Sequence, residues 1–319
     1  MIKMMEIVHR PVLKEEIWNF LKPDKPNELM VDTTLGEGGH AEFFLKRSPT
    51  LRVVGLDADE TILNVAKSRL APFKSRLEYY HTWFNNFFQS YPLKLERPDI
   101  ILFDLGISTF HFEKSGRGFS FNKNETLDMR LDEDLEISAF DIVNSYPQKE
   151  LAEILFRYGE ERYSTIISRA IVRERRKGPI ETTEQLKELI RGAVPAKYRY
   201  GRIHPATRTF QALRIAVNGE LVRLEMAILN AIKILKVGGK IGVVSFHSLE
   251  DRIVKNIFRE KSKTCKCPPE QPVCTCRGGR IIQVLTKKPI RPTEEEIREN
   301  PSCRSARFRA ALKRKEEEL

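Results

Sequence analysis

Three aspartates stand at the ends of short apolar runs that are typical of buried strands: Asp32, Asp57 and Asp104. The carboxyl ends of parallel strands meet at one edge of a sheet, so we expect these carboxylates to lie close together. The turn after Asp32 has glycines at positions 36, 38 and 39, which let the backbone bend tightly and approach a ligand. An acid about twenty residues after such a turn can accept hydrogen bonds from both ribose hydroxyls of a nucleoside. The spacing therefore predicts a nucleoside cofactor with its ribose on Asp57.

The type of cofactor follows from the glycine pattern, which reads G-x-G-G and not the G-x-G-x-x-G of dinucleotide-binding turns. This pattern favours S-adenosylmethionine, which has no pyrophosphate to be cradled and whose cationic end Asp32 can face. An NAD-dependent oxidoreductase, which also needs an acid at Asp57, is the alternative enzyme class. Two interpretations involve no chemistry: an ordinary turn with a solvated Asp57, or an RNA-binding or assembly factor with a vestigial cofactor site.

The elements that must position these residues alternate between strand and helix patterns. Runs of apolar and β-branched residues predict strands, and apolar spacings of three and four residues predict helices between them. The strands are expected up to residue 31 and at residues 51–56, 77–80, 99–105, 240–246 and 281–285. The loop after the third run carries Phe84, an aromatic that either covers an adenine or belongs to the core. We predict an α/β fold with a doubly wound sheet.

The composition narrows the class of protein. The chain has 319 residues, 41% of them hydrophobic, which is enough for one large α/β domain with an insertion. No apolar run approaches the roughly 20 residues of a membrane span, and residues 1–11 show no signal-peptide pattern, so we expect a cytoplasmic protein. The net charge of +11 favours a polyanionic partner such as nucleic acid.

Between the fourth and fifth expected strands the alternation stops, and residues 111–205 show only helical patterns. We predict an inserted helical domain there that recognises RNA, with residues 1–110 and 206–319 forming the cofactor-binding domain. The segment 197–211 interleaves basic with aromatic side chains: Lys197, Arg199, Arg202 and Arg208 with Tyr198, Tyr200 and Phe210. Basic groups neutralise phosphates and aromatics stack on unpaired bases. A solvated helix face is the alternative interpretation.

Two further patterns concern the return of the chain to the sheet. Residues 210–235 carry apolar side chains at steps of three and four, which predicts one long core helix that ends at the glycine pair 238–239. After the strand at 240–246, Ser248 and Asp251 are spaced as a capping box for the next helix. His247 between them is either a general base or a hydrogen-bonded structural histidine.

The last part of the chain contains a cysteine loop and a basic end. Two C-x-C pairs lie in the loop 262–280, six residues apart: Cys265, Cys267, Cys274 and Cys276. Four thiolates can enclose a tetrahedral zinc ion, although the spacing is not that of a standard zinc finger, and four reduced cysteines are the alternative. Residues 293–319 are dense in charge, which predicts a mobile basic tail or an arm that RNA orders.

Eight segments, in this order along the chain, resemble one known family. They are HRPVL, DTTLGEGGH, DLGIS, GRGFSF, LDMRLD, FQALRIAVNGEL, VVSFHSLEDR and RPTEEEIRENPSCRSARFRA. Together they resemble the RsmH (MraW) family of S-adenosylmethionine-dependent methyltransferases. That family methylates the exocyclic amine (N4) of a cytosine in bacterial small-subunit (16S) ribosomal RNA, near the decoding site.

The resemblance implies a class I (Rossmann-like) methyltransferase sheet with an inserted, mostly helical domain. It places cofactor-binding positions on Gly38, Gly39, His40, Asp57, Phe84 and Asp104, and a further one, often glutamine in the family, on His111. It implies small-subunit ribosomal RNA as the partner, in the form of the assembled subunit, and leaves monomer and homodimer both open. The cysteine loop resembles an insert that many but not all members have.

The implied reaction assigns a role to Asp104. A cytosine amine is a poor nucleophile because its lone pair is delocalised into the ring, and an acceptor for its N–H groups helps the nitrogen to become tetrahedral. Asp104 is our candidate for that catalytic acceptor, although it can serve the cofactor instead. The cytosine must leave its stack, and we expect Phe246, His247 and the loop at 116–121 to form walls of its pocket.

Overall fold

The structure is a computed structural model that describes residues 11–201, 203–265, 267, 271 and 279–317. The chain forms two compact units: Met1–Gly106 with Leu221–Leu319, and Ile107–Glu220. The second unit thus extends beyond the expected insertion at 111–205 and includes the helix that follows it. No helix in the described part of the chain combines the length and apolar character that crossing a membrane requires.

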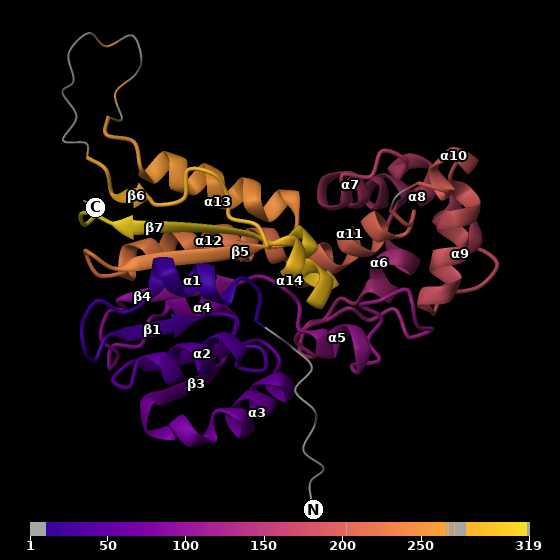
Figure 1. Cartoon of the computed structure of the whole chain (residues 1–319). Helices are drawn as coiled ribbons and strands as arrows, with labels where there is room; N and C mark the ends of the chain where they lie inside the picture. The colour runs from indigo at the N-terminus through magenta and orange to yellow at the C-terminus, as the bar shows by residue number, and fades with distance from the viewer. Residues whose placement is uncertain (1–10, 202, 266, 268–270, 272–278, 318–319) are drawn as a thin grey trace, which may run out of the picture. The chain divides into compact units, whose positions relative to one another are not determined.

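The first unit is built on a seven-stranded sheet with the order β3-β2-β1-β4-β5-β7-β6 (Figure 1). The strands are β1 (Leu29–Asp32), β2 (Arg52–Asp57), β3 (Leu77–His81), β4 (Ile100–Asp104), β5 (Lys240–Ser245), β6 (Ile282–Val284) and β7 (Arg307–Lys313). The first five pair in parallel, and β7 runs antiparallel to both β5 and β6. This arrangement confirms the predicted class I, Rossmann-like sheet, and β1 lies between β2 and β4.

Helices cover both faces of this sheet. One face packs against α1 (Lys14–Leu21), α2 (Gly39–Arg47) and α3 (Glu60–Arg69), and the other against α4 (Phe84–Gln89), α12 (Glu220–Ile234) and α13 (Ser248–Lys261). Successive side chains of a strand point to opposite faces, so Met30 and Val31 of β1 are fully buried in two different cores. Burial on both faces explains why the strands read as continuous apolar runs.

The second unit is helical and has a core of its own. It contains α5 (Thr109–Glu113), α6 (Ala139–Ser145), α7 (Gln148–Gly159), α8 (Ser164–Glu174), α9 (Thr183–Ala193), α10 (Ala196–Arg199) and α11 (Thr207–Asn218). Fully buried aliphatic side chains from several of these helices meet, among them Leu155, Ile167, Leu186 and Leu213. The apolar stripes that the sequence shows after residue 138 are therefore buried within this unit.

The prediction of a single long helix at 210–235 is wrong. The chain forms α11 and α12 instead, and Gly219 between them has a φ of 58° and donates its N–H to the carbonyl of Ile215 as a C-cap. Only glycine adopts this left-handed conformation without strain. The three- and four-residue spacing continues across the break, so the apolar pattern gave no sign of it.

The prediction of a basic tail at 293–319 is also wrong for most of these residues. Residues 293–317 form α14 (Glu294–Glu299), the short 3-10 helix η2 (Pro301–Ser305) and β7, which is an internal strand of the sheet. Two of its charged side chains are buried: Arg309 pairs with Asp251 of α13, and Lys313 donates to the carbonyls of Lys233 and Leu235 at the end of α12. The charges that suggested a solvated tail instead fasten β7 to two helices.

Candidate active site

The sheet brings the three strand-end aspartates to one edge, as expected. Asp32 lies opposite Gly55 of β2 and Leu102 of β4 in the parallel register. Asp57 and Asp104 each follow two residues later on these neighbouring strands. Because parallel strands end at the same side, the three carboxylates face one region beyond the tips of β2, β1 and β4.

Asp57 also fixes the glycine turn. Its Oδ2 accepts the backbone N–H of Gly36 at 2.8 Å, and its Oδ1 accepts that of Asp59 at 2.9 Å. Asp59 in turn caps α3 by accepting the N–H groups of Thr61 and Ile62, as aspartate before a helix commonly does. A carboxylate oxygen accepts more than one hydrogen bond, so this geometry is compatible with a ribose contact, which stays a prediction.

The turn itself needs glycine at position 38. Gly38 has a φ of 82°, and a Cβ added there would lie 2.8 Å from Cδ1 of Leu70. The next glycine, Gly39, packs against Pro11, with a Cβ position 3.3 Å from that ring. The N–H of Gly38 donates to the carbonyl of Leu35 at 2.8 Å, and the N–H groups of residues 39 and 40 lie at the N-terminal end of α2, where they can meet a ligand's polar atoms. The cofactor roles of these positions stay predictions.

Beside the turn lies a cluster of buried ionisable groups: Asp32, His40 and Asp104, with exposures of 1%, 5% and 8%. The Nε2 of His40 is 3.3 Å from Oδ2 of Asp104. Oδ1 of Asp104 has no hydrogen-bond partner among the described residues. Burial raises the pKa of Asp32 to about 7; the charges of Asp104 and Asp57 add to this, and His40 opposes it. This edge of the sheet thus has more carboxyl groups than basic groups that could neutralise them.

Phe84 begins α4 and is half-buried, with its ring edge-on to Phe103 at 5.7 Å between centroids. Part of the ring belongs to the core and part is exposed, so both interpretations of Phe84 remain compatible with its position. Next to it, the buried Trp83 stacks under the guanidinium of Arg223 from α12, 4.2 Å from the ring centroid. This contact fixes the loop that carries Phe84 to the helix layer.

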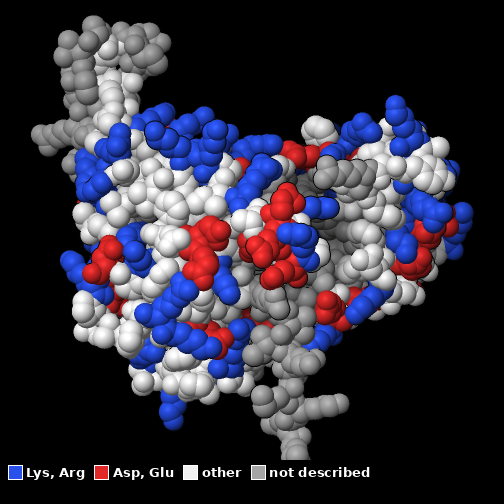
Figure 2. All heavy atoms as spheres, viewed as in Figure 1, with Lys and Arg blue, Asp and Glu red and all other residues white. Residues whose placement is uncertain are grey.

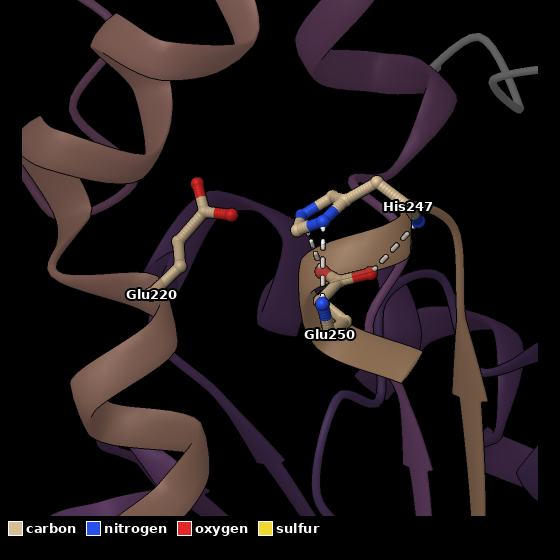
Figure 3. Close-up of side chains that lie close together, drawn as sticks. All are labelled: Glu220, His247 and Glu250. Carbon is tan, nitrogen blue, oxygen red and sulfur yellow. Dashed lines mark hydrogen bonds and ion pairs between the residues drawn. The ribbon is translucent and has the colours of Figure 1, made fainter. Parts of the chain in front are cut away.

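His247 at the tip of β5 caps α13, and the predicted capping box at Ser248 and Asp251 is wrong by one residue (Figure 3). Its Nδ1 accepts the N–H of Glu250 at 3.4 Å, and its Nε2 lies 3.1 Å from a carboxylate oxygen of the same residue. The other oxygen of Glu250 accepts the N–H groups of Phe246 and His247. Nδ1 of His247 thus caps the helix start, which supports the structural interpretation, and its role as a general base stays a prediction.

His111 lies in the second unit, on α5, where it is 4% exposed and its ring packs edge-on against Phe119. The contact of His111 with the cofactor stays a prediction. Phe119 belongs to the loop at 116–121, whose role as a pocket wall likewise stays a prediction.

The basic and aromatic segment at 197–211 is used largely for internal contacts. Arg199 donates to the carbonyls of Gly192 and Val194 at the end of α9, and Arg208 donates to that of Glu160. Phe210 is buried, whereas Tyr200 is 88% exposed. Arg202 lies outside the described residues.

Tyr198 is anchored in the same way. Its hydroxyl donates to the buried Glu161 at 2.7 Å, and burial raises its pKa to about 12. Of the three aromatics expected to stack on bases, Phe210 is excluded by its burial and Tyr198 has its ring packed against Tyr163. Tyr200 is the one whose ring is open to a partner.

The zinc site stays a prediction. Cys265 is exposed and Cys267 is half-buried, and the N–H of Cys267 points to the Sγ of Cys265 at 3.4 Å. Cys274 and Cys276 lie outside the described residues.

The sequence pointed to Asp104 and His40 separately but not to their contact. The pairing depends on β4 lying next to β1, which no local pattern shows. Thr34 was missed altogether: its Oγ1 accepts the backbone N–H of Asp104 at 2.8 Å. A hydroxyl two residues after a strand-end acid is the only sequence signal for it.

The chain matches the model of the MraW methylase family over residues 6–314. It is 53% identical over 309 residues to the ribosomal RNA small subunit methyltransferase H of Treponema denticola, covering 97% of this chain and 98% of that protein. It is 48% identical to the protein of the same name from Carboxydothermus hydrogenoformans, covering 97% and 99%.

Among solved structures, an rRNA methylase from Streptococcus thermophilus has a TM-score of 0.41 at 11% identity, covering 97% of this chain and 99% of that one. A likeness at this level carries no argument about function. The match to the family model and the two relatives spans nearly the whole chain, and the glycine turn and strand-end acids lie within it. The chain belongs to the MraW methylase family.

Proposed function

We propose that this protein transfers a methyl group from S-adenosylmethionine to the exocyclic amine (N4) of a cytosine in bacterial small-subunit ribosomal RNA. One observation carries the proposal: Oδ1 of Asp104 is a buried acceptor at a strand tip with no hydrogen-bond partner among the described residues. Such an acceptor is costly unless a ligand satisfies it, and an amine N–H does so. The names of the relatives supply the RNA, and the family resemblance supplies the cytosine amine.

The residues at this edge fit S-adenosylmethionine. Asp57 holds the glycine turn and can accept the ribose hydroxyls as well, and Asp32 provides negative charge for a cationic ligand group. When bound, the cofactor supplies an electrophilic methyl group on its sulfonium sulfur. A cation beside Asp32 favours the ionised form of this carboxyl, which burial otherwise disfavours.

We assign two tasks to Asp104. Its carboxylate accepts an N–H of the cytosine amine, which favours a tetrahedral nitrogen with an available lone pair and stabilises the positive charge that develops there. The nitrogen gives up one proton for the methyl group that it gains, and the same carboxylate accepts that proton. A role in holding the cofactor is the alternative for Asp104, and it differs in its effect on cofactor affinity.

The proposed substrate is the assembled small subunit in the cytoplasm, because a folded surround that holds one base unstacked reduces the energy of extracting it. The net charge of +11 suits RNA, and Figure 2 shows Lys and Arg side chains gathered over α13 of the first unit. In the helical unit, the exposed Tyr200 is the candidate for base stacking. A homodimer and a structural zinc ion at the four loop cysteines remain separate proposals.

The test is mass spectrometry of small-subunit RNA nucleosides after incubation of subunits with the protein and methyl-labelled cofactor. We expect label on the cytosine amine with the wild type and at least a hundredfold less with Asp104→Asn. Calorimetry with S-adenosylhomocysteine should show similar affinity for both proteins, since the acceptor acts on the amine. Label on a ring carbon, on ribose or on protein would refute the proposal, and a parallel loss of cofactor affinity would assign Asp104 to the cofactor.

A further inference from the structure

His40 is a buried histidine whose backbone N–H belongs to the predicted cofactor-binding turn, whereas its side chain has no task in the proposed reaction. Its side chain is 6% exposed and lies at the start of α2, directly after the glycine turn. Its Nε2 is 3.3 Å from Oδ2 of Asp104. A histidine that only filled the core would have no need to face a carboxylate.

Two side chains lie against Asp104: Thr34 and His40. Its backbone N–H donates to Oγ1 of Thr34 at 2.8 Å, which fixes the tip of β4 against the glycine turn. Its Oδ2 lies 3.3 Å from Nε2 of His40, an ion-pair contact without a hydrogen bond in this structure, and Oδ1 has no hydrogen-bond partner among the described residues. One oxygen therefore has a close side-chain neighbour in the protein, and the other is left for a ligand.

We propose that His40 is a positioning residue for Asp104: in the complex with substrate the N–H at its Nε2, which lies 3.3 Å from Oδ2 in this structure, donates to that oxygen, so that Oδ1 keeps the orientation that meets the substrate amine. The inference rests on the proposed transfer through Asp104 and deepens it. A carboxylate turns about two bonds, and fixing one oxygen sets the direction of the other. Positioning of this kind makes a large contribution to rate, because misplacement by about 1 Å can lower it about a hundredfold.

The electrostatics of the cluster support this role. Three ionisable groups act on Asp32 of β1: Asp57 of β2, Asp104 of β4 and His40. Burial and the two neighbouring carboxylates raise the pKa of Asp32, and His40 is the group that opposes them. His40 is thus the group whose charge favours the ionised form of Asp32.

The test compares His40→Gln with His40→Leu. Glutamine can place an amide N–H near the position of Nε2, whereas leucine fills similar volume without a donor. The matched control is His81→Leu, at the exposed end of β3, whose Nε2 lies 3.0 Å from the carbonyl of Ala58. Single-turnover methyl transfer at saturating cofactor, calorimetry with S-adenosylhomocysteine, and the carboxyl-carbon resonance of Asp104 in ¹³C-labelled protein are measured for all variants.

We expect His40→Leu to lower the rate constant at least thirtyfold with cofactor affinity within threefold, and His40→Gln to retain at least a third of the wild-type rate. The Asp104 resonance should move in His40→Leu and stay in His81→Leu. A rate for His40→Leu within threefold of wild type overturns the inference, and so does a His40→Gln variant as slow as His40→Leu. The resonance needs no substrate, so it distinguishes this failure from failure of the proposed reaction, which the wild-type assay alone reveals.

Discussion

Two groups of buried charges in the first unit differ in how they are satisfied. At the C-terminal strand, Asp251 receives Nε of Arg309 at 2.6 Å and a guanidinium nitrogen of Arg307 at 3.2 Å. These guanidinium groups lower the pKa of Asp251 below its ordinary value, although burial acts against them. At the strand-tip edge, Nε2 of His40 lies 3.3 Å from Oδ2 of Asp104, and burial raises the pKa of Asp32, to which the charges of Asp104 and Asp57 add.

Burial of charge does not by itself mark a functional site. Both groups contain carboxylates less than a tenth exposed. The paired group joins α13 to β7 and leaves little unsatisfied, which is what a structural contact needs. The strand-tip group keeps an acceptor without a described partner and an excess of acid, which a substrate or cofactor can relieve.

The largest expected effect on stability comes from breaking the paired group. Arg309→Met removes the main partner of Asp251 and leaves a buried carboxylate with only Arg307, so we expect the free energy of unfolding to fall by about 3 kcal/mol. Denaturant unfolding measures it. The double variant Asp251→Leu with Arg309→Met should recover part of this loss, and affinity for S-adenosylhomocysteine should not change at temperatures where the variant is folded. A loss of that affinity would mean that the two groups are coupled.

At the strand-tip edge, we expect a substitution that raises the unfolding free energy relative to wild type as the pH rises. Because the pKa of Asp32 is raised in the folded protein, its contribution to stability is present at low pH and is lost as the pH rises toward 7. Asp32→Asn removes this dependence. The unfolding free energy of the variant relative to wild type should therefore increase by about 2 kcal/mol between pH 5.5 and pH 8.

The measurement for Asp32 is denaturant unfolding of both proteins without ligand across this pH range. A difference that stays constant with pH would contradict the assignment of the raised pKa. We also expect the variant to bind S-adenosylhomocysteine more weakly, because stability and binding place opposite demands on this carboxyl.

The smallest effect is expected at Lys313, which is fully buried and reaches two carbonyls at the end of α12. Arg97 also donates to these carbonyls, so they keep a partner when the lysine is lost. Burial lowers the pKa of Lys313, because removing the ammonium group from water disfavours its charged form. We expect Lys313→Met to lower the unfolding free energy by about 1 kcal/mol, measured by denaturant unfolding, with methyl transfer unchanged. A loss above 3 kcal/mol would show that Arg97 does not compensate.

The sequence determined the parts of this protein that depend on local chemistry. The glycine turn, the acid at the end of each of three strands and the cap at Asp59 follow from residue type and short spacing, and the structure has all of them. The apolar runs also determined the class of sheet, because strands buried on both faces must be apolar throughout. The family resemblance rests on the same local segments.

Other features were decided only by the tertiary structure. Whether residues 307–313 form a tail or a strand depends on partners such as Asp251, which are far away in the sequence and turn exposed-looking charges into buried pairs. The break at Gly219 depends on backbone conformation, to which apolar spacing is insensitive. The contact of His40 with Asp104 depends on β4 pairing with β1. Sequence patterns report what a segment prefers, whereas the pairing of distant segments decides which charges are neutralised and which stay available for chemistry.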